Sequence, residues 1–144
     1  MGLTVRNAEY FYTRIEASPE KAYELLAQLA SAEVNLLAFS AVPFGPNHFE
    51  LTIFPDRSDT FLQLARKLGW VVVGPQHAFL VQGDDNLGAL ADIQQMLLEA
   101  DVAIYASSGV TDGNGRFGYV IYFREADHQR AARALGAVML PKTA

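Results

Sequence analysis

This sequence contains an internal repeat, which predicts that two similar structural units make up the chain. When the chain is shifted by 68 residues against itself, the segment 32–36 (Ala-Glu-Val-Asn-Leu) aligns without a gap with 100–104 (Ala-Asp-Val-Ala-Ile). The same shift aligns further apolar residues: Leu25 with Ile93, Leu29 with Leu97, Phe49 with Phe117 and Ile53 with Ile121. A shift of 67 then matches Leu68-Gly69 with Leu135-Gly136, so one deletion separates the two copies. We interpret this pattern as a duplicated unit of about 68 residues.

Chance matching of apolar residues is the alternative, since 51% of the residues are hydrophobic. The order of the expected elements argues against chance. Hydrophobic spacing and turn residues in the first half predict the following elements: a strand at 9–16, a helix that starts after Ser18-Pro19, strands at 34–42 and 48–54 around a turn at 45–47, a helix at 58–68 and a strand at 70–73. Ser18 is a suitable N-cap, and Pro19 suits the first helical position.

The second half predicts the same order of elements. They are a strand at 78–82, a loop at 83–88, a helix with Leu90, Ile93 and Leu97 on its inner face, strands at 102–107 and 117–123 around a turn at 111–115, a helix at 126–135 and a strand at 137–140. Gly74-Pro75 marks the expected junction, so we predict two modules, 1–74 and 75–144.

A β-α-β-β-α-β order predicts an α+β, ferredoxin-like fold, with an antiparallel sheet and both helices on one face. A module this small buries a modest core, and an open sheet edge invites pairing with another strand. We therefore expect the fold to occur twice, with the two halves paired side by side. Edges that remain open favour a homodimer.

Composition excludes several classes of function. The chain has 11 Lys and Arg against 16 Asp and Glu, with no basic cluster, so nucleic acid is not an expected partner. It has no cysteine, which excludes thiolate chemistry and iron–sulfur clusters. No leader-like or long apolar segment is present, so we expect a cytoplasmic protein that does not bind a membrane.

The loop before the first helix of the second half is the candidate binding site. It contains Asp85, Asn86, Leu87 and Gly88. Free amides at a helix N-terminus can bind a carboxylate, and a neighbouring Asp can bind an ammonium group. These are the two charged groups of an α-amino acid. The alternative is that Asp85 or Asn86 is simply the N-cap and the glycines are turn residues.

The repeated unit resembles the ACT domain family, small ligand-sensing modules attached to many enzymes of amino-acid metabolism. Asp85-Asn86-Leu87-Gly88 is similar to the Asp-x-Pro-Gly pattern of that family's first loop, and Val34-Asn35-Leu36 is similar to the Val/Ile-Asn-Ile that opens its second strand. The resemblance covers nearly the whole chain and implies a tandem pair. In that family, amino-acid effectors bind between the first loop of one module and the second strand of the other.

The two halves depart from the family pattern in opposite ways. The second loop keeps Asp85 and Gly88, whereas the first loop, 17–20, has Ala17 and Glu20 at those places. At the second strand, the first half keeps Asn35 and the second half has Ala103. If the halves pair as in the family, the resemblance implies one intact site, made of loop 85–88 with Asn35 and Leu36, and one eroded site.

We therefore expect a non-catalytic regulatory protein that binds an amino acid or related metabolite and acts on a metabolic enzyme. No cofactor or metal is expected, since His48, His77 and His128 are far apart in the sequence. The alternatives are an interaction module without a ligand, or a small ferredoxin-like enzyme that uses a carboxylate such as Asp85. The aromatic residues at 105, 117, 119, 122 and 123 are expected to pack the core, and some of them could line a pocket.

Overall fold

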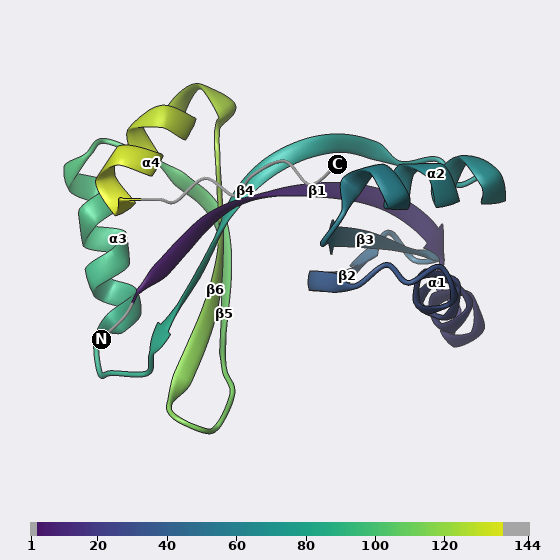
Figure 1. Cartoon of the computed structure of the whole chain (residues 1–144), viewed down its shortest axis with the longest axis horizontal. Coiled ribbons are helices and arrows are strands. Elements are labelled where there is room, and N and C mark those ends of the chain that lie inside the picture. The colour runs from purple at the N-terminus through teal and green to yellow at the C-terminus, as the bar shows by residue number, and fades with distance from the viewer. Residues whose placement is uncertain (1–2, 137–144) are drawn as a thin grey trace. The chain divides into compact units, whose positions relative to one another are not determined.

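The computed structural model describes residues 3–136. The elements, in order, are β1 (Thr4–Glu16), α1 (Pro19–Ser31), β2 (Leu36–Phe44), β3 (His48–Pro55), α2 (Ser58–Leu68), β4 (Val73–Asp84), α3 (Ala89–Glu99), β5 (Ile104–Thr111), β6 (Arg116–Phe123), the 3-10 helix η1 (Glu125–Asp127) and α4 (His128–Leu135) (Figure 1). The chain divides into two compact units. Within the described residues, the first unit is 9–76, and the second unit is 77–136 together with 3–8.

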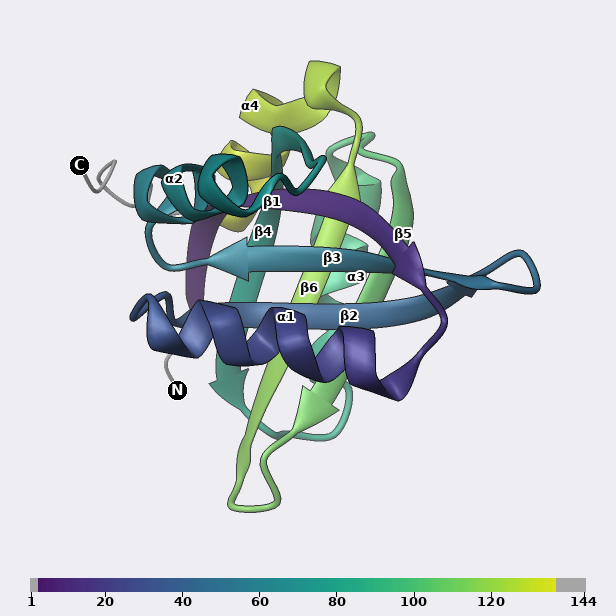
Figure 2. The ribbon, with the colours of Figure 1, turned by 90° about the vertical axis from the view of Figure 1, so that its right-hand side faces the viewer.

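The first unit is a β-α-β-β-α-β fold. Its strands lie in the order β2-β3-β1-β4, and β3 pairs antiparallel with both β1 and β2. Helices α1 and α2 pack on the same face of this sheet (Figure 2), where Leu25, Leu29 and Phe61 meet Phe11 and Ile53. All five side chains are buried, and this apolar burial is what stabilises the unit.

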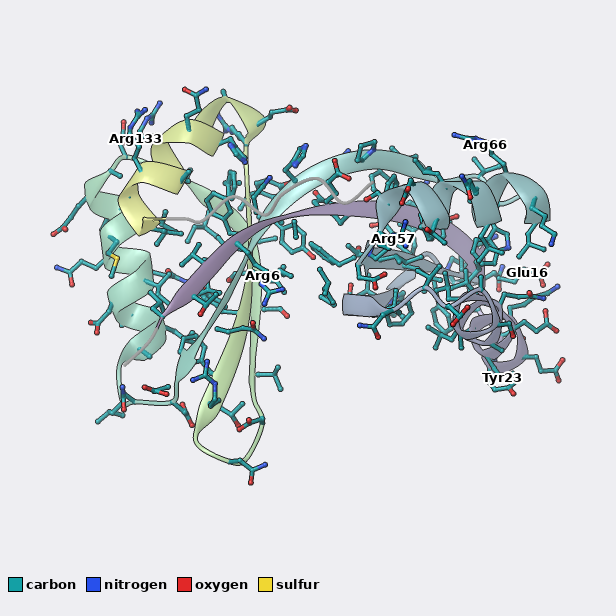
Figure 3. The ribbon with its side chains drawn as sticks, viewed as in Figure 1. Arg6, Glu16, Tyr23, Arg57, Arg66 and Arg133 are labelled. Carbon is teal, nitrogen blue, oxygen red and sulfur yellow. The ribbon has the colours of Figure 1, made fainter. Side chains whose placement is uncertain are left out.

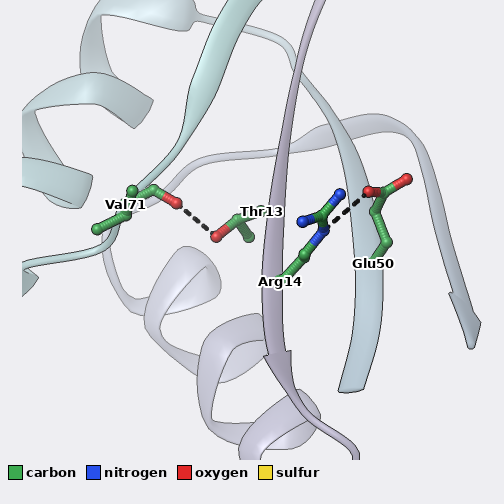
Figure 4. A network of polar contacts seen from close by, with 4 residues as sticks. All are labelled: Thr13, Arg14, Glu50 and Val71. Carbon is green, nitrogen blue, oxygen red and sulfur yellow. Dashed lines mark hydrogen bonds and ion pairs between the residues drawn. The ribbon is translucent and has the colours of Figure 1, made fainter. Parts of the chain in front are cut away.

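Polar contacts link β1 to neighbouring segments of the first unit. The Thr13 hydroxyl donates a hydrogen bond of 2.6 Å to the carbonyl oxygen of Val71 (Figure 4). The Arg14 guanidinium lies 3.3 Å from a carboxylate oxygen of Glu50, its neighbour across the β1–β3 ladder. The same guanidinium lies 3.6 Å from the ring centroid of Phe44. Because Arg14 and Glu50 are partly exposed, this ion pair adds little stability.

The second unit has the corresponding order β1-β4-β6-β5, in which β6 pairs antiparallel with β4 and β5. Helices α3 and α4 supply Ile93, Leu97 and Leu135 to a core that also contains Phe79 and Ile121. The strand beside β4 is the N-terminal part of β1, and its Val5 is buried in the same core. Arg6, labelled in Figure 3, donates a hydrogen bond of 3.4 Å to the side-chain oxygen of Gln82 on β4.

Equivalent backbone contacts confirm the repeat. The amides of Val34 and Val102 donate hydrogen bonds of 2.9 Å to Leu29 and Leu97, respectively, which are equivalent residues under the 68-residue shift. Glu33 and Asp101 are also equivalent, and both have φ 59°, a left-handed conformation that non-glycine residues rarely adopt. Chance matching of apolar residues does not explain a shared pattern of backbone geometry.

Several predicted elements differ in their bounds. The prediction of two separate strands, at 70–73 and 78–82, is wrong. The structure has a single strand, β4, which runs through Gly74-Pro75. Gly83, expected in the loop, lies inside β4 and pairs with Phe117. The strand expected at 9–16 begins earlier, at Thr4. The predicted strand at 137–140 lies outside the described residues.

The α+β, ferredoxin-like fold class is confirmed, and it occurs twice. Residues 3–8 group with the second unit. The sequence predicts modules at 1–74 and 75–144. These boundaries, and the side-by-side pairing of the two modules, remain predictions. Over the described residues, no helix is long and apolar enough to cross a membrane.

Candidate functional site

The candidate loop, 85–88, connects β4 to α3 and is fixed at its start by two backbone hydrogen bonds. The Asp85 amide donates to the carbonyl oxygen of Gly115 at 2.8 Å, which ties the loop to the β5–β6 turn. The Asn86 amide donates to the carbonyl oxygen of Asp84 at 2.9 Å. Beside this turn, the Arg116 guanidinium lies 3.1 Å from the Asp84 carboxylate. The loop therefore starts from a defined backbone conformation.

Gly88 is the N-cap of α3, in a left-handed conformation with φ 85°. No side chain caps this helix, so the alternative in which Asp85 or Asn86 is a conventional cap is not what the structure contains. A side chain at position 88 would be strained at this φ, although a Cβ there would meet nothing within 4 Å. The space in front of the Gly88 backbone is therefore open.

Within the part of the chain that the structure describes, two backbone donors of the loop are not used. Among the described residues, none accepts a hydrogen bond from the amides of Leu87 or Gly88. They lie next to the N-terminus of α3, where the helix dipole favours negative charge. Asp85, Asn86, Leu87 and Gly88 are all exposed. The loop that contains these two amides therefore lies at the surface of the second unit.

The corresponding loop of the first unit starts from the same backbone frame. The Ala17 amide donates to Asn47 at 2.8 Å, and the Ser18 amide donates to Glu16 at 2.8 Å. From Ser18 onward the chemistry differs. Ser18 caps α1 by accepting a hydrogen bond from the Lys21 amide, and Pro19 has no amide hydrogen. Glu20 adds a negative charge to the first turn, which disfavours a bound anion.

Asn35 and Leu36, the other predicted site residues, belong to the first unit. The Asn35 amide donates to the Asp56 carboxylate at 3.2 Å, and the Asp56 amide donates to the Asn35 carbonyl oxygen at 2.8 Å. The Asn35 side chain is exposed, and Leu36, the first residue of β2, is half-buried. The backbone of Asn35 is thus fixed while its side-chain amide faces solvent.

The turn that holds the loop contains a carboxylate with a perturbed pKa. Asp112 accepts hydrogen bonds from the backbone amides of Asn114 at 2.7 Å and of Arg116 at 3.1 Å. These bonds, with a smaller effect of the Arg116 charge, hold the pKa of Asp112 below its ordinary value. They account for the Asp-Gly-Asn-Gly sequence as a turn, and this part of the chain needs no bound ion.

The histidines and aromatic residues are arranged differently from what their sequence positions suggested. His77 and His128, far apart in sequence, have ring centroids only 5.9 Å apart. No group of three metal-ligating side chains occurs among the described residues. Phe117, Tyr119 and Phe123 are buried in the core as expected, whereas the side chain of Tyr105 is 64% exposed. Sequence reasoning missed the histidine pair because only the fold brings β4 and α4 together.

Comparisons with known proteins add information on the fold. No family model and no curated protein matches the chain. Among solved structures, a Bacteroides thetaiotaomicron protein is similar with a TM-score of 0.78 and 17% identity, over 92% of this chain and 88% of that one. The ligand-free regulatory subunit of aspartate kinase from Thermus thermophilus is similar with a TM-score of 0.67 and 15% identity, over 94% and 95%.

The regulatory subunit of aspartate kinase from Thermus flavus gives a similar result, with a TM-score of 0.62 and 14% identity over 94% of this chain and 95% of that one. These similarities extend over both units and are too distant in sequence to establish more than the fold. They agree with the resemblance drawn from the repeat and the loop residues, and the chain has a tandem ACT-like fold.

Proposed function

We propose that this chain is a non-catalytic regulatory protein that binds an α-amino acid, or a closely related metabolite, at loop 85–88. One observation carries the proposal: the amides of Leu87 and Gly88 are exposed and without an acceptor among the described residues, beside the start of α3. Two consecutive N–H donors beside a helix N-terminus suit a carboxylate.

Asp85 supplies the complementary charge. Its side chain is exposed and has no hydrogen-bond or ion-pair partner among the described residues. The carboxylate of Asp84, by contrast, pairs with Arg116. An ammonium group one carbon away from a carboxylate bound at Leu87 and Gly88 would therefore find Asp85 as its nearest unpaired acid in the loop.

Asn35 and Leu36 remain proposed ligand residues on the strength of the ACT resemblance. The exposed Asn35 side chain has donors and an acceptor to offer a polar ligand. Its contribution is tested by Asn35→Ala, which leaves the backbone hydrogen bonds with Asp56 in place.

The fold supports a regulatory role. Proteins with a similar fold include regulatory subunits of aspartate kinase, and the regulated partner that we propose is an enzyme of amino-acid metabolism. A catalytic role has less support, because the exposed, polar loop 85–88 lacks the enclosed environment that activates a catalytic carboxylate.

We also propose that the chain forms a homodimer through a sheet edge. The edge strands β2 and β5 contain no charged residue, and β5 is exposed over Tyr105–Thr111. An uncharged, exposed edge is a template for pairing with another strand. This observation also favours the second candidate function, an interaction module that binds no metabolite.

A thermal-shift screen of the full chain against the twenty amino acids tests the proposal. A ligand at 100 times its dissociation constant adds about 2.7 kcal/mol to the free energy of unfolding. A rise in Tm with one amino acid or a few related ones supports sensing. No rise with any of them favours the interaction module, and turnover of a ligand would establish an enzyme.

A further inference from the structure

A cluster of three polar side chains in the second unit has no part in the proposed ligand site. Asn7 lies on the N-terminal part of β1, His77 on β4 and His128 at the start of α4. The Asn7 side-chain oxygen lies 3.0 Å from Nε2 of His128, and its side-chain nitrogen lies 3.4 Å from Nδ1 of His77. We call these residues the Asn7 cluster. A single amide thus bridges two titratable rings.

His128 of the Asn7 cluster occupies a position at which the first unit has an apolar residue. Under the 67-residue shift of the repeat, His128 corresponds to Phe61, which packs on Phe11 with ring centroids 4.9 Å apart. His128 packs in the same way on Phe79, the equivalent of Phe11, at 5.4 Å. An ionisable side chain therefore occupies a place where the repeat otherwise has a fully buried apolar ring.

The surroundings of His128 oppose its charge. Burial and the neighbouring His77 lower the pKa of His128, and Glu125 of η1 raises it by a smaller amount. Asp127, the preceding residue, pairs with Arg130 at 3.4 Å. The groups that face His128 from β1 and β6 are uncharged, namely Asn7 and Phe123. His77 faces the amide of Asn7 and the ring of His128.

The chemistry of an amide limits how many protons the Asn7 cluster can hold. The amide oxygen accepts from Nε2–H of His128, and the amide nitrogen donates to Nδ1 of His77, which must then be without a proton. If both rings are charged, each presents an N–H to Asn7, and the amide has only one accepting end. In either orientation of the amide, its NH₂ group then faces an N–H of one of the two rings, and no hydrogen bond can form between these two donors.

We propose that the Asn7 cluster is a proton-sensitive attachment for residues 4–8, the part of β1 that belongs to the second unit. With at most one ring charged, Asn7 bonds to both rings and holds this segment on β4 and α4. When both rings are charged, one bond is lost and the segment loosens. Because β1 continues from this segment into the first unit, acid acts on the strand that serves both units.

Native-state hydrogen exchange of the full chain tests this attachment. Protection factors of the amides of Val5–Ala8, corrected for intrinsic exchange, should fall about tenfold between pH 7.5 and pH 5.0. Leu51 and Ile53, in the core of the first unit, are the internal control and should keep their protection. Equal protection of Val5–Ala8 at both pH values would overturn the proposal.

Asn7→Asp is the decisive variant, because a carboxylate can accept from two imidazolium rings at once. In this variant the pH effect should reverse, so that protection of Val5–Ala8 is higher at pH 5.0 than at pH 7.5. His48→Gln, at the exposed start of β3 in the first unit, is the matched control and should behave as the wild type. A variant Asn7→Asp that loosens in acid as the wild type does would also contradict the proposal, and the wild-type measurement stands even if the variant does not fold.

Discussion

The two strand-to-helix loops of this chain, 17–20 and 85–88, begin with the same backbone hydrogen bonds and differ in the residues that follow. In both, the first two loop amides donate to equivalent carbonyl oxygens, with all four distances at 2.8 or 2.9 Å. In the first loop Pro19 has no amide hydrogen and Ser18 accepts from the Lys21 amide, whereas in the second loop the amides of Leu87 and Gly88 have no acceptor among the described residues. Ser18, Pro19 and Glu20 thus stand where the second loop has Asn86, Leu87 and Gly88, and they make the start of α1 less suited to an anion than the start of α3.

The largest expected effect comes from transferring the chemistry of the first loop to the second. Leu87→Pro together with Gly88→Glu removes one amide donor and adds a negative charge at the start of α3. A hydrogen bond to a charged group contributes about 1.5–3 kcal/mol, and the added negative charge repels a carboxylate as well. We therefore expect binding of the amino acid identified in the thermal-shift screen to weaken by about 100-fold or more. Isothermal titration calorimetry measures this change.

The matched control makes the reverse exchange, Pro19→Leu with Glu20→Gly, in the first loop. Affinity for the amino acid should stay within about twofold of the wild type, because the first loop has no part in the proposed site. A twofold change in affinity corresponds to about 0.4 kcal/mol of binding free energy. Equal losses of affinity for the two double variants would show that the loops do not differ in function.

A smaller effect is expected from Asp85→Ala, which removes the carboxylate of the second loop that has no partner among the described residues. Binding of the amino acid should weaken about tenfold, which corresponds to about 1.4 kcal/mol, close to the lower end of the contribution of a charged hydrogen bond (about 1.5–3 kcal/mol). The analogue that lacks the amino group should bind the wild type and the variant equally. An equal loss for both ligands would assign Asp85 to the shape of the loop.

The sequence predicted the repeat, the fold class and most elements, because hydrophobic spacing and capping residues act locally. Ser18, Pro19 and Gly69 have the cap positions that their residue types favour. The predicted junction at Gly74-Pro75 does not interrupt the strand, although a Gly-Pro pair usually marks a turn. In the structure, a Cβ on Gly74 would lie 2.8 Å from the Tyr10 carbonyl oxygen, so glycine is needed there for close approach of β4 to β1.

The rest could not be predicted, because it depends on contacts between distant segments. Nothing local in residues 4–8 shows that they pair with β4 and bury Val5 in the second core. The proximity of His77 to His128 arises only when α4 packs on that sheet. The free amides of the second loop depend on Gly88, rather than Asp85 or Asn86, acting as the N-cap.

A difference in stability should also separate the loops. Ser18→Ala removes a side chain that accepts from the Lys21 amide, so we expect it to lower the free energy of unfolding by about 1 kcal/mol. Asn86→Ala, at the equivalent position, removes no cap hydrogen bond and should cost less than about 0.5 kcal/mol. Urea denaturation of both variants checks this order, and an Asn86→Ala variant as unstable as Ser18→Ala would contradict it.

The smallest expected effect concerns the two hairpin turns that hold the loops. The first turn, 44–47, has Phe44 where the second has Asp112, so only the second contains a titratable side chain. Hydrogen bonds from the backbone amides of Asn114 and Arg116 lower the pKa of Asp112 in the folded state. The stabilisation is therefore complete above the unfolded pKa of about 3.9 and is lost as the pH falls through the lower folded value.

We expect the amides of Asn114 and Arg116 to show an NMR chemical-shift change centred below pH 3.9, the approximate pKa of an unperturbed Asp, in the folded protein. Asp112→Asn should abolish this change, because the amide side chain can still accept the two bonds but does not titrate. The amides of Asn47 and His48 in the first hairpin should not follow the same transition. Since the Asp85 amide donates to Gly115, acid that loosens the second turn should also shift the Asp85 amide signal, which connects the protonation of this turn to the candidate loop.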